Sequence, residues 1–127
     1  MIDALFSQSS YMVSKKMLDV TALRNEAIAS NIANLETPGY KRLDVAPSFQ
    51  TELKQAVESQ NTSRIGSLQP QLTVDSSVTS GNRDGNTVQL ESELMNLSQN
   101  TLAHTLETQL VSSSLMRLQS AISGRVA

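Results

Sequence analysis

The sequence contains no cysteine and no tryptophan, and aromatic residues make up only 3% of it. Without cysteine the chain can form neither disulfides nor thiolate zinc sites, and it has no cysteine nucleophile. With an apolar fraction of 39% and so few aromatic side chains, a chain of 127 residues can form only a small hydrophobic core of its own. The chain is therefore one modest domain at most.

Charge and hydropathy argue against nucleic-acid-binding and membrane proteins. The net charge of -2, without a basic cluster, gives no electrostatic case for nucleic acid, and a membrane-surface helix would need a face rich in lysine and arginine. No apolar run approaches the roughly 20 residues that span a bilayer. The first residues, MIDALFSQSS, carry an acid at Asp3 and no basic segment, so we expect no cleavable secretory signal. The location is then the cytoplasm, or one reached by an export route that does not read such a signal.

Apolar residues at steps of three and four predict an amphipathic helix over about the first 30 residues. Within it Val13, Val20 and Ala27 form a heptad row. Such a row suits packing against another long helix, and ordinary core packing explains it equally well.

A second apolar series predicts a long helix near the end of the chain, with Gly124 as its stop. Asn86 and Gln89 resemble a capping box at its start, and Glu91 and Glu93 suit the positive end of its dipole. Its apolar residues follow helical spacing over a wide arc, and exposed apolar area of that extent marks an interface. They are Leu90, Leu94, Leu97, Leu102, Leu106, Leu110, Val111, Leu115, Leu118 and Ile122.

The middle of the chain differs in kind. Residues 47–60 predict a short helix with Phe49, Leu53 and Val57 on one stripe. Beyond them the sequence is rich in serine, asparagine, threonine and glycine, and only QLTV suggests a brief strand. A polar stretch of this length is typical of a functional or disordered loop.

These patterns predict a mainly α fold, in which long N- and C-terminal helices that can pair antiparallel enclose a polar, largely irregular middle segment. The expected parts are an N-terminal helix in residues 1–36, a turn, short helix and flexible insert in 37–86, and a C-terminal helix in 87–127. Antiparallel pairing would bring Asp3 near Arg125, and Lys15 or Lys16 near Glu107.

The first helix must end by about Glu36, because Thr37 precedes a proline and is pushed towards extended geometry. Pro38-Gly39 then predicts a type II turn, with positive φ at the glycine. Asn34 lies where its amide can satisfy a carbonyl of the helix end. Asn31, one turn earlier on the same face, needs another explanation, and we expect a buried polar partner for it in this chain or on a neighbour.

The stretch ASNIANLETPGYK, residues 29–41, resembles the N-terminal signature of the rod and hook family of bacterial flagellar axial proteins. DGNTV, residues 84–88, is similar to the segment that opens the C-terminal helix in the proximal rod members of that family. The helix–insert–helix layout agrees, so the resemblance covers nearly the whole chain. The residues that match as assembly motifs are Asn31, Asn34, Thr37, Pro38, Gly39 and Tyr40, then Asp84, Gly85, Asn86, Thr87 and Val88.

The resemblance implies a self-assembling subunit of the basal-body rod in the periplasm, exported by the flagellar type III apparatus without cleavage. It implies terminal helices that pack as a coiled coil around the export channel. It also implies other rod proteins, the base of the rod, like subunits and the export apparatus as partners, with no nucleic acid or small-molecule substrate.

No catalytic, cofactor or metal site is expected. His104, the only histidine, falls inside the second helix without a nucleophile or phosphate loop to accompany it. The alternative function is a small helical export chaperone or adaptor, which would not need NIANLETPGYK. A cell-wall hydrolase would need a pair of catalytic carboxylates, and none is evident.

Overall fold

The computed structural model describes residues 2–79 and 81–124, with side chains from Gln8 onward. The fold is mainly helical. Its elements in chain order are α1 (Ile2–Ala33), β1 (Leu43–Val45), α2 (Ser48–Glu58), α3 (Thr62–Ser67), β2 (Leu72–Val74) and α4 (Leu90–Ser123). None of the helices in the described residues is long and apolar enough to span a membrane.

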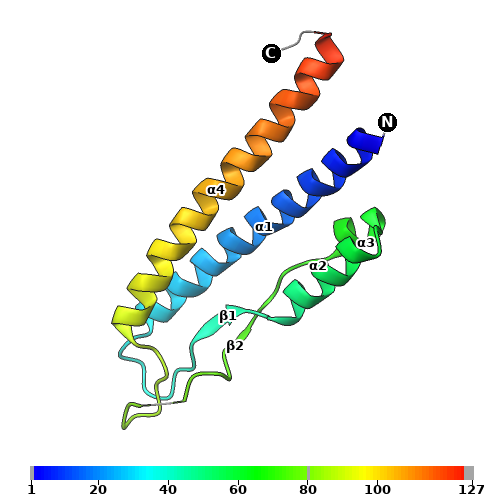
Figure 1. Ribbon diagram of the computed structural model, residues 1–127. Coiled ribbons are helices and arrows are strands. Elements are labelled where there is room, and N and C mark those ends of the chain that lie inside the picture. Colours follow the sequence, from blue (N-terminus) through cyan, green and yellow to red (C-terminus); the bar gives the residue numbers. More distant parts are fainter. Residues whose placement is uncertain (1, 80, 125–127) are drawn as a thin grey trace.

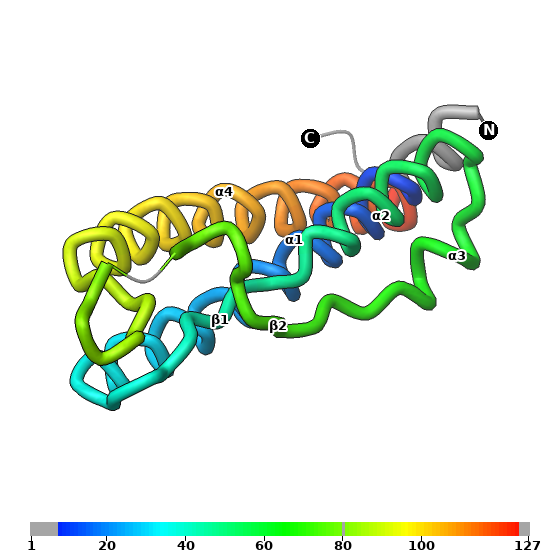
Figure 2. The backbone as a smooth tube through the Cα atoms, turned by 90° about the horizontal axis from the view of Figure 1, so that it is seen from below, coloured from blue at the N-terminus to red at the C-terminus, as the bar shows by residue number. Residues whose placement is uncertain are grey.

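Helices α1 and α4 run antiparallel, so that the beginning of α1 and the end of α4 lie at the same end of the molecule (Figure 1). The middle elements lie on the other side of α1, which contacts α4 as well as β1, β2 and α3. After β2 the chain returns to the end of α1 before it enters α4 (Figure 2). The antiparallel pairing of the two long helices predicted from the sequence is thus present, and α1 is the central element.

The apolar core lies between α1 and the middle elements. Val20 of α1 is buried there with residues of β1, α2 and α3, and Val13 packs against the same cluster. The heptad row of α1 therefore serves core packing at Val13 and Val20. The buried cluster consists of Val20, Val45, Phe49, Leu53, Ala56 and Ile65.

The middle segment contains more regular structure than its composition indicated. The short helix and the strand in QLTV are present as α2 and β2, whereas β1 and α3 were not predicted. Strands β1 and β2 pair antiparallel, with Leu43 opposite Val74 and Val45 opposite Leu72. Val45 and Leu72 both contact the core cluster, so the sheet is anchored by one apolar pair.

The predicted boundaries of α4 are partly right. Gly124 ends the helix in a left-handed conformation with φ +67°, as expected, and Glu91 and Glu93 lie in the first turn. The capping box is wrong. The N-cap residue is Gln89 and not Asn86, and it makes no side-chain capping bond. The amide of Asn86 instead binds carbonyls of the segment that follows α1.

Polar side chains of α4 contact α1. Asn100 Nδ2 donates to the carbonyl of Thr21 at 2.8 Å, and His104 Nδ1 lies 2.9 Å from the Thr21 hydroxyl. Neither Lys15 nor Lys16 forms the predicted ion pair with Glu107, since the ion pairs of the described chain all involve Arg24 or Arg42. The predicted pair Asp3–Arg125 lies outside the described side chains.

The leucines and methionines of α4 are mostly exposed. Leu102 is 73% exposed, and Met95, Met116 and Ile122 are also largely exposed. This is the reverse of an ordinary surface helix, whose apolar stripe faces the core. The exposed apolar residues cover more than one side of the helix, and we call them together the exposed apolar face of α4: Leu90, Leu94, Met95, Leu102, Leu106, Leu110, Leu115, Met116, Leu118 and Ile122.

Candidate functional site

The first motif folds as the turn that its sequence predicts. Gly39 has φ +73°, and the amide of Tyr40 donates to the carbonyl of Thr37 at 3.3 Å. Positive φ after proline with this hydrogen bond is the geometry of a type II turn. Asn34 Nδ2 donates to the carbonyl of Ser30 at 2.8 Å, so this amide satisfies a carbonyl of the helix end as expected.

The second motif binds the end of α1. Asn86 is fully buried, and its Nδ2 lies 3.0, 3.0 and 2.8 Å from the carbonyl oxygens of Asn34, Leu35 and Thr37. The last carbonyls of a helix have no partner within the helix. Here the side chain of Asn86 binds carbonyls of the segment that directly follows α1, while its Oδ1 accepts from the amide of Val88 at 2.8 Å.

Main-chain hydrogen bonds join the two motifs along their length. The amide of Gly39 donates to the carbonyl of Asp84 at 2.9 Å, and the amide of Thr87 donates to the carbonyl of Tyr40 at 3.0 Å. The Thr87 hydroxyl in turn accepts from the amide of Arg42 at 2.8 Å. Motifs far apart in the sequence therefore form one structure, the polar junction, which we define as Asn31, Asn34, residues 37–42, residues 84–88 and Glu93.

Asn31 has the buried partners that its position required, and they belong to the same chain. Its Oδ1 accepts from the amide of Leu43 at 2.8 Å, and its Nδ2 donates to the carbonyl of Leu43 at 2.9 Å. The side chain thus pairs with the beginning of β1 as another strand would. It also contacts the hydroxyl of Tyr40 and the carboxylate of Glu93, each at 3.3 Å.

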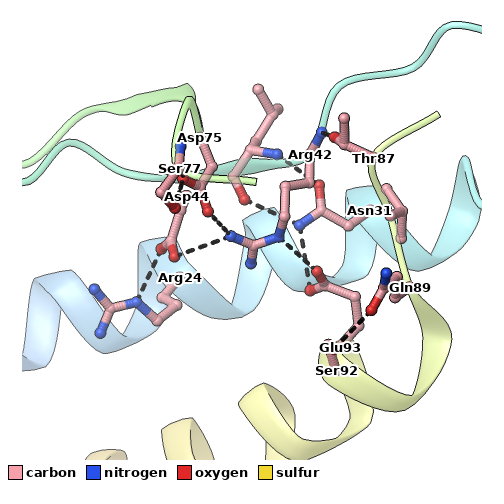
Figure 3. Close-up of polar contacts among 12 residues, drawn as sticks. Arg24, Asn31, Arg42, Asp44, Asp75, Ser77, Thr87, Gln89, Ser92 and Glu93 are labelled. Atoms are coloured by element: carbon pink, nitrogen blue, oxygen red, sulfur yellow. Dashed lines mark hydrogen bonds and ion pairs between the residues drawn. The ribbon is translucent and has the colours of Figure 1, made fainter. Parts of the chain in front are cut away.

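A charge network joins the junction to the sheet (Figure 3). Arg42 Nε donates to Glu93 Oε1 at 2.7 Å, and its Nη1 pairs with Asp75 and, at 3.5 Å, with Asp44. Arg24 of α1 binds Asp44 at 3.0 Å. Glu93 is fully buried and Arg42 nearly so, which makes their pairing obligatory because an isolated buried charge is very costly.

The pKa values of the network follow from these contacts. Burial alone would lower the pKa of Arg42, but the hydrogen bond and charge of Glu93, with Asp75 and Asp44, outweigh burial and raise it. Hydrogen bonds from Ser77, followed by Arg42, lower the pKa of Asp75 despite its partial burial. A lowered carboxylate pKa stabilises the fold at neutral pH, and that stabilisation is lost as the pH falls through the folded-state pKa.

The chemistry of the junction is that of a structural link. Its polar side chains are amides, hydroxyls, the cations of Lys41 and Arg42 and the carboxylates of Asp84 and Glu93, which bond within the junction and to its neighbours. No group of metal-ligating residues occurs in the described part of the chain. His104 lies elsewhere, against Thr21. The arrangement fixes the end of α1, the start of α4 and β1 relative to one another.

Comparison with known proteins agrees with this geometry. A protein of Borrelia hermsii, named flagellar basal body rod protein FlgB, is 31% identical over 119 residues, which cover 80% of this chain and 86% of that protein. The chain belongs to the FlgB family of flagellar basal body rod proteins. FlgB proteins of Proteus mirabilis strain HI4320 and Aquifex aeolicus are 27% and 29% identical, over 96% and 87% of this chain and 98% and 90% of theirs.

The family model described as flagella basal body rod protein matches residues 18–41. This stretch contains the last turns of α1 and the whole first motif, so the match ends beside Arg42. The FlgB family consists of structural rod proteins of the flagellar basal body. Membership of this chain in the family implies that it associates with other basal-body components.

Sequence reasoning missed the charged members of the site. Glu93 was assigned only to the helix dipole, and Arg42 and Asp75 were not singled out. The signal for Glu93 was its helical spacing, because it lies two turns before Asn100 on the same row, and Asn100 faces α1. Nothing local indicates that Arg42 and Asp75 meet, since their contact depends on the pairing of β1 with β2.

Replacing Gly39 with valine is expected to lower the free energy of unfolding by about 1–2 kcal/mol, because a left-handed conformation is strained for an L residue. An added Cβ would have open space, so the effect comes from the backbone alone. Urea unfolding measures it, with Gly81→Val, in the loop between β2 and α4, as the control without a positive φ. In cells, Gly39→Val should reduce motility more than His104→Ala does. Equal losses of unfolding free energy for the two glycine variants, or a larger loss of motility with His104→Ala, would contradict the role of the turn.

Proposed function

We propose that this chain is a subunit of the proximal rod that uses the polar junction to hold α1 and α4 as one unit, and the exposed apolar face of α4 to bind neighbouring subunits. The exposed face is the observation that supports this most. Apolar patches larger than a few hundred Å² are uncommon on monomeric proteins and mark interaction sites. A helix with its leucines outside is suited to a protein that finishes its core by assembly.

We further propose that α1 and α4 pair as a coiled coil. Three residues of α4 bond to α1: Glu93 to Asn31, and Asn100 and His104 to Thr21. They lie seven and then four residues apart, which is the spacing of a coiled-coil seam. The seam is unusually polar for a coiled coil. Polar seam residues specify register at a cost in stability, which suits a pair that must present one defined outer face.

The remaining features of this function are also proposals. The organisation is a helical core from residues 1–36 and 87–127 with residues 37–86 as an insert. The partners are like subunits, other rod proteins, the base of the rod and the export apparatus. The subunit reaches the periplasm by type III export without cleavage of a signal peptide, and it catalyses no reaction.

Replacing Leu102 with serine tests the function of the exposed face. Because Leu102 is 73% exposed in the subunit, we expect little change in its free energy of unfolding, within about 0.5 kcal/mol. We expect loss of swimming in cells whose chromosomal copy is replaced, because an apolar contact between subunits is removed. Val57→Ser on α2 is the matched control, since Val57 is 41% exposed but lies outside α4.

Immunoblots of the subunit in cells and in purified basal bodies separate poor production from failed assembly. Normal motility with Leu102→Ser, or equal loss with Val57→Ser, would contradict the assignment of the α4 face to assembly.

A further inference from the structure

The charges of α4 are few and far apart. From Leu94 to Ser123, Glu107 and Arg117 are the only acidic or basic residues besides His104, and all others are apolar, amide or hydroxyl residues. Each charge lies among exposed apolar neighbours, Leu106 and Leu110 beside Glu107, and Met116 and Leu118 beside Arg117. A pair of opposite charges set into an apolar surface specifies how that surface is matched by a partner.

Neither charge has an ionic partner in the described part of the chain. The ion pairs found there involve only Arg24 or Arg42 with Asp44, Asp75 and Glu93. Glu107 is half-buried beside α1, and burial raises the pKa of its carboxyl. The ionised carboxylate is therefore disfavoured in the isolated subunit, and a cation brought by a neighbour would offset that cost.

The two residues cannot pair with each other within one helix. They are ten residues apart, about 15 Å along the helix axis, which is far beyond ion-pair distance. A second copy of the chain removes this restriction, because a shift along the axis brings Arg117 of one helix level with Glu107 of another.

We propose that the α4 helices of adjacent copies pack in parallel with a stagger of about ten residues, or 15 Å, so that Arg117 of one copy binds Glu107 of the next. This inference rests on the proposed rod function. The same stagger places Met116 of one copy level with Leu106 of its neighbour, so that exposed apolar side chains meet beside the ion pair. Each copy then uses one charge towards each of two neighbours.

An antiparallel pair of α4 helices would also bring both charges together, but with both contacts between the same two copies. That arrangement is isologous and closes at the dimer, whereas the parallel stagger is heterologous and continues from copy to copy. A shaft built from repeated subunits requires the heterologous form.

A chain carrying both Glu107→Cys and Arg117→Cys distinguishes these arrangements, because the natural sequence has no cysteine. Basal bodies are purified from cells in which it is the only copy, oxidised mildly and run on a non-reducing gel. The parallel stagger predicts a ladder of dimers, trimers and larger species. Dimers alone indicate the antiparallel pair, and either that result or the absence of cross-links overturns the proposal. Chains with one of the two cysteines are the controls and should remain monomeric.

Charge reversal tests the same contact without cysteine. Glu107→Arg alone and Arg117→Glu alone should each lower the yield of basal bodies about tenfold, because like charges then meet at every contact. Producing the two variant chains in the same cell should restore the yield. One variant carries a positive charge at both positions and the other a negative charge at both, so opposite charges meet at every contact where the copies alternate.

Failure of the mixture to restore assembly, or normal yields from both single variants, overturns the proposed contact. The proposed function is judged separately by Leu102→Ser. Loss of assembly with that variant, together with neutral charge reversals, would leave the α4 face as an assembly surface and reject only the stagger.

Discussion

Glu93→Ala is expected to lower the free energy of unfolding by about 3–5 kcal/mol, the usual consequence of removing one partner of a buried ion pair. Glu93 is fully buried, and its loss leaves the buried guanidinium of Arg42 without its acceptor at 2.7 Å. It also removes a hydrogen-bond partner of Asn31. Since Glu93 is the point at which α4 enters the junction, the start of α4 should separate from the end of α1.

The matched control is Glu91→Ala. Both glutamates lie in the first turn of α4 and both favour its dipole, but Glu91 is exposed and has no ion pair in the described chain. The dipole contribution is typically about 0.3–1 kcal/mol, so Glu91→Ala should cost no more than about 1 kcal/mol. Urea unfolding followed by circular dichroism measures both. A similar small loss for the two variants would show that Glu93 serves the dipole alone, as its sequence position first indicated.

A double-mutant cycle refines the result. Arg42→Met with Glu93→Leu replaces both charges by apolar side chains of similar size, and removing both partners of a buried pair is often far less costly than removing one. The double variant should therefore be less destabilised than the sum of the two single variants. Additive effects would contradict a direct coupling between these two side chains.

The elements that were predicted correctly are those whose signal is local. The steps of three and four define α1 and α4 because each helix is long, and the Pro38-Gly39 pair defines the turn because few other conformations accept it. The resemblance to the flagellar rod and hook family is likewise confirmed by the FlgB relatives. Asn31 was rightly expected to have a buried partner, since its amide on a helix face required one.

The elements that were missed depend on distant contacts. Strand β1 has three residues and exists because Asn31, β2 and the core hold it, none of which is visible in LDV. The capping box at Asn86 was wrong because spacing alone cannot show that three carbonyls of the segment after α1 bind the same amide. The resemblance indicated both motifs, but only the three-dimensional structure brings them into one junction.

Asn31→Leu is the second variant with a large expected effect. Leucine keeps the helix and approximate volume but removes both hydrogen bonds to the main chain of Leu43, at 2.8 and 2.9 Å. Each main-chain group left without a partner costs about 1–3 kcal/mol when it is shielded from water. Since these bonds hold β1 on α1, we expect faster hydrogen exchange over residues 37–45 and 84–93 than in the unmodified chain.

In cells we expect the Asn31→Leu subunit to be made and exported but not assembled, because a misplaced β1 also disturbs Arg42 and the start of α4. Asn25→Leu is the control on the same helix, since Asn25 is exposed, and it should leave unfolding and motility nearly unchanged. Comparing the two variants separates the loss of a buried amide from the gain of a leucine on α1. Normal swimming of the Asn31→Leu strain, with exchange rates equal to those of Asn25→Leu, would refute the role of Asn31 in assembly and show that the junction holds without it.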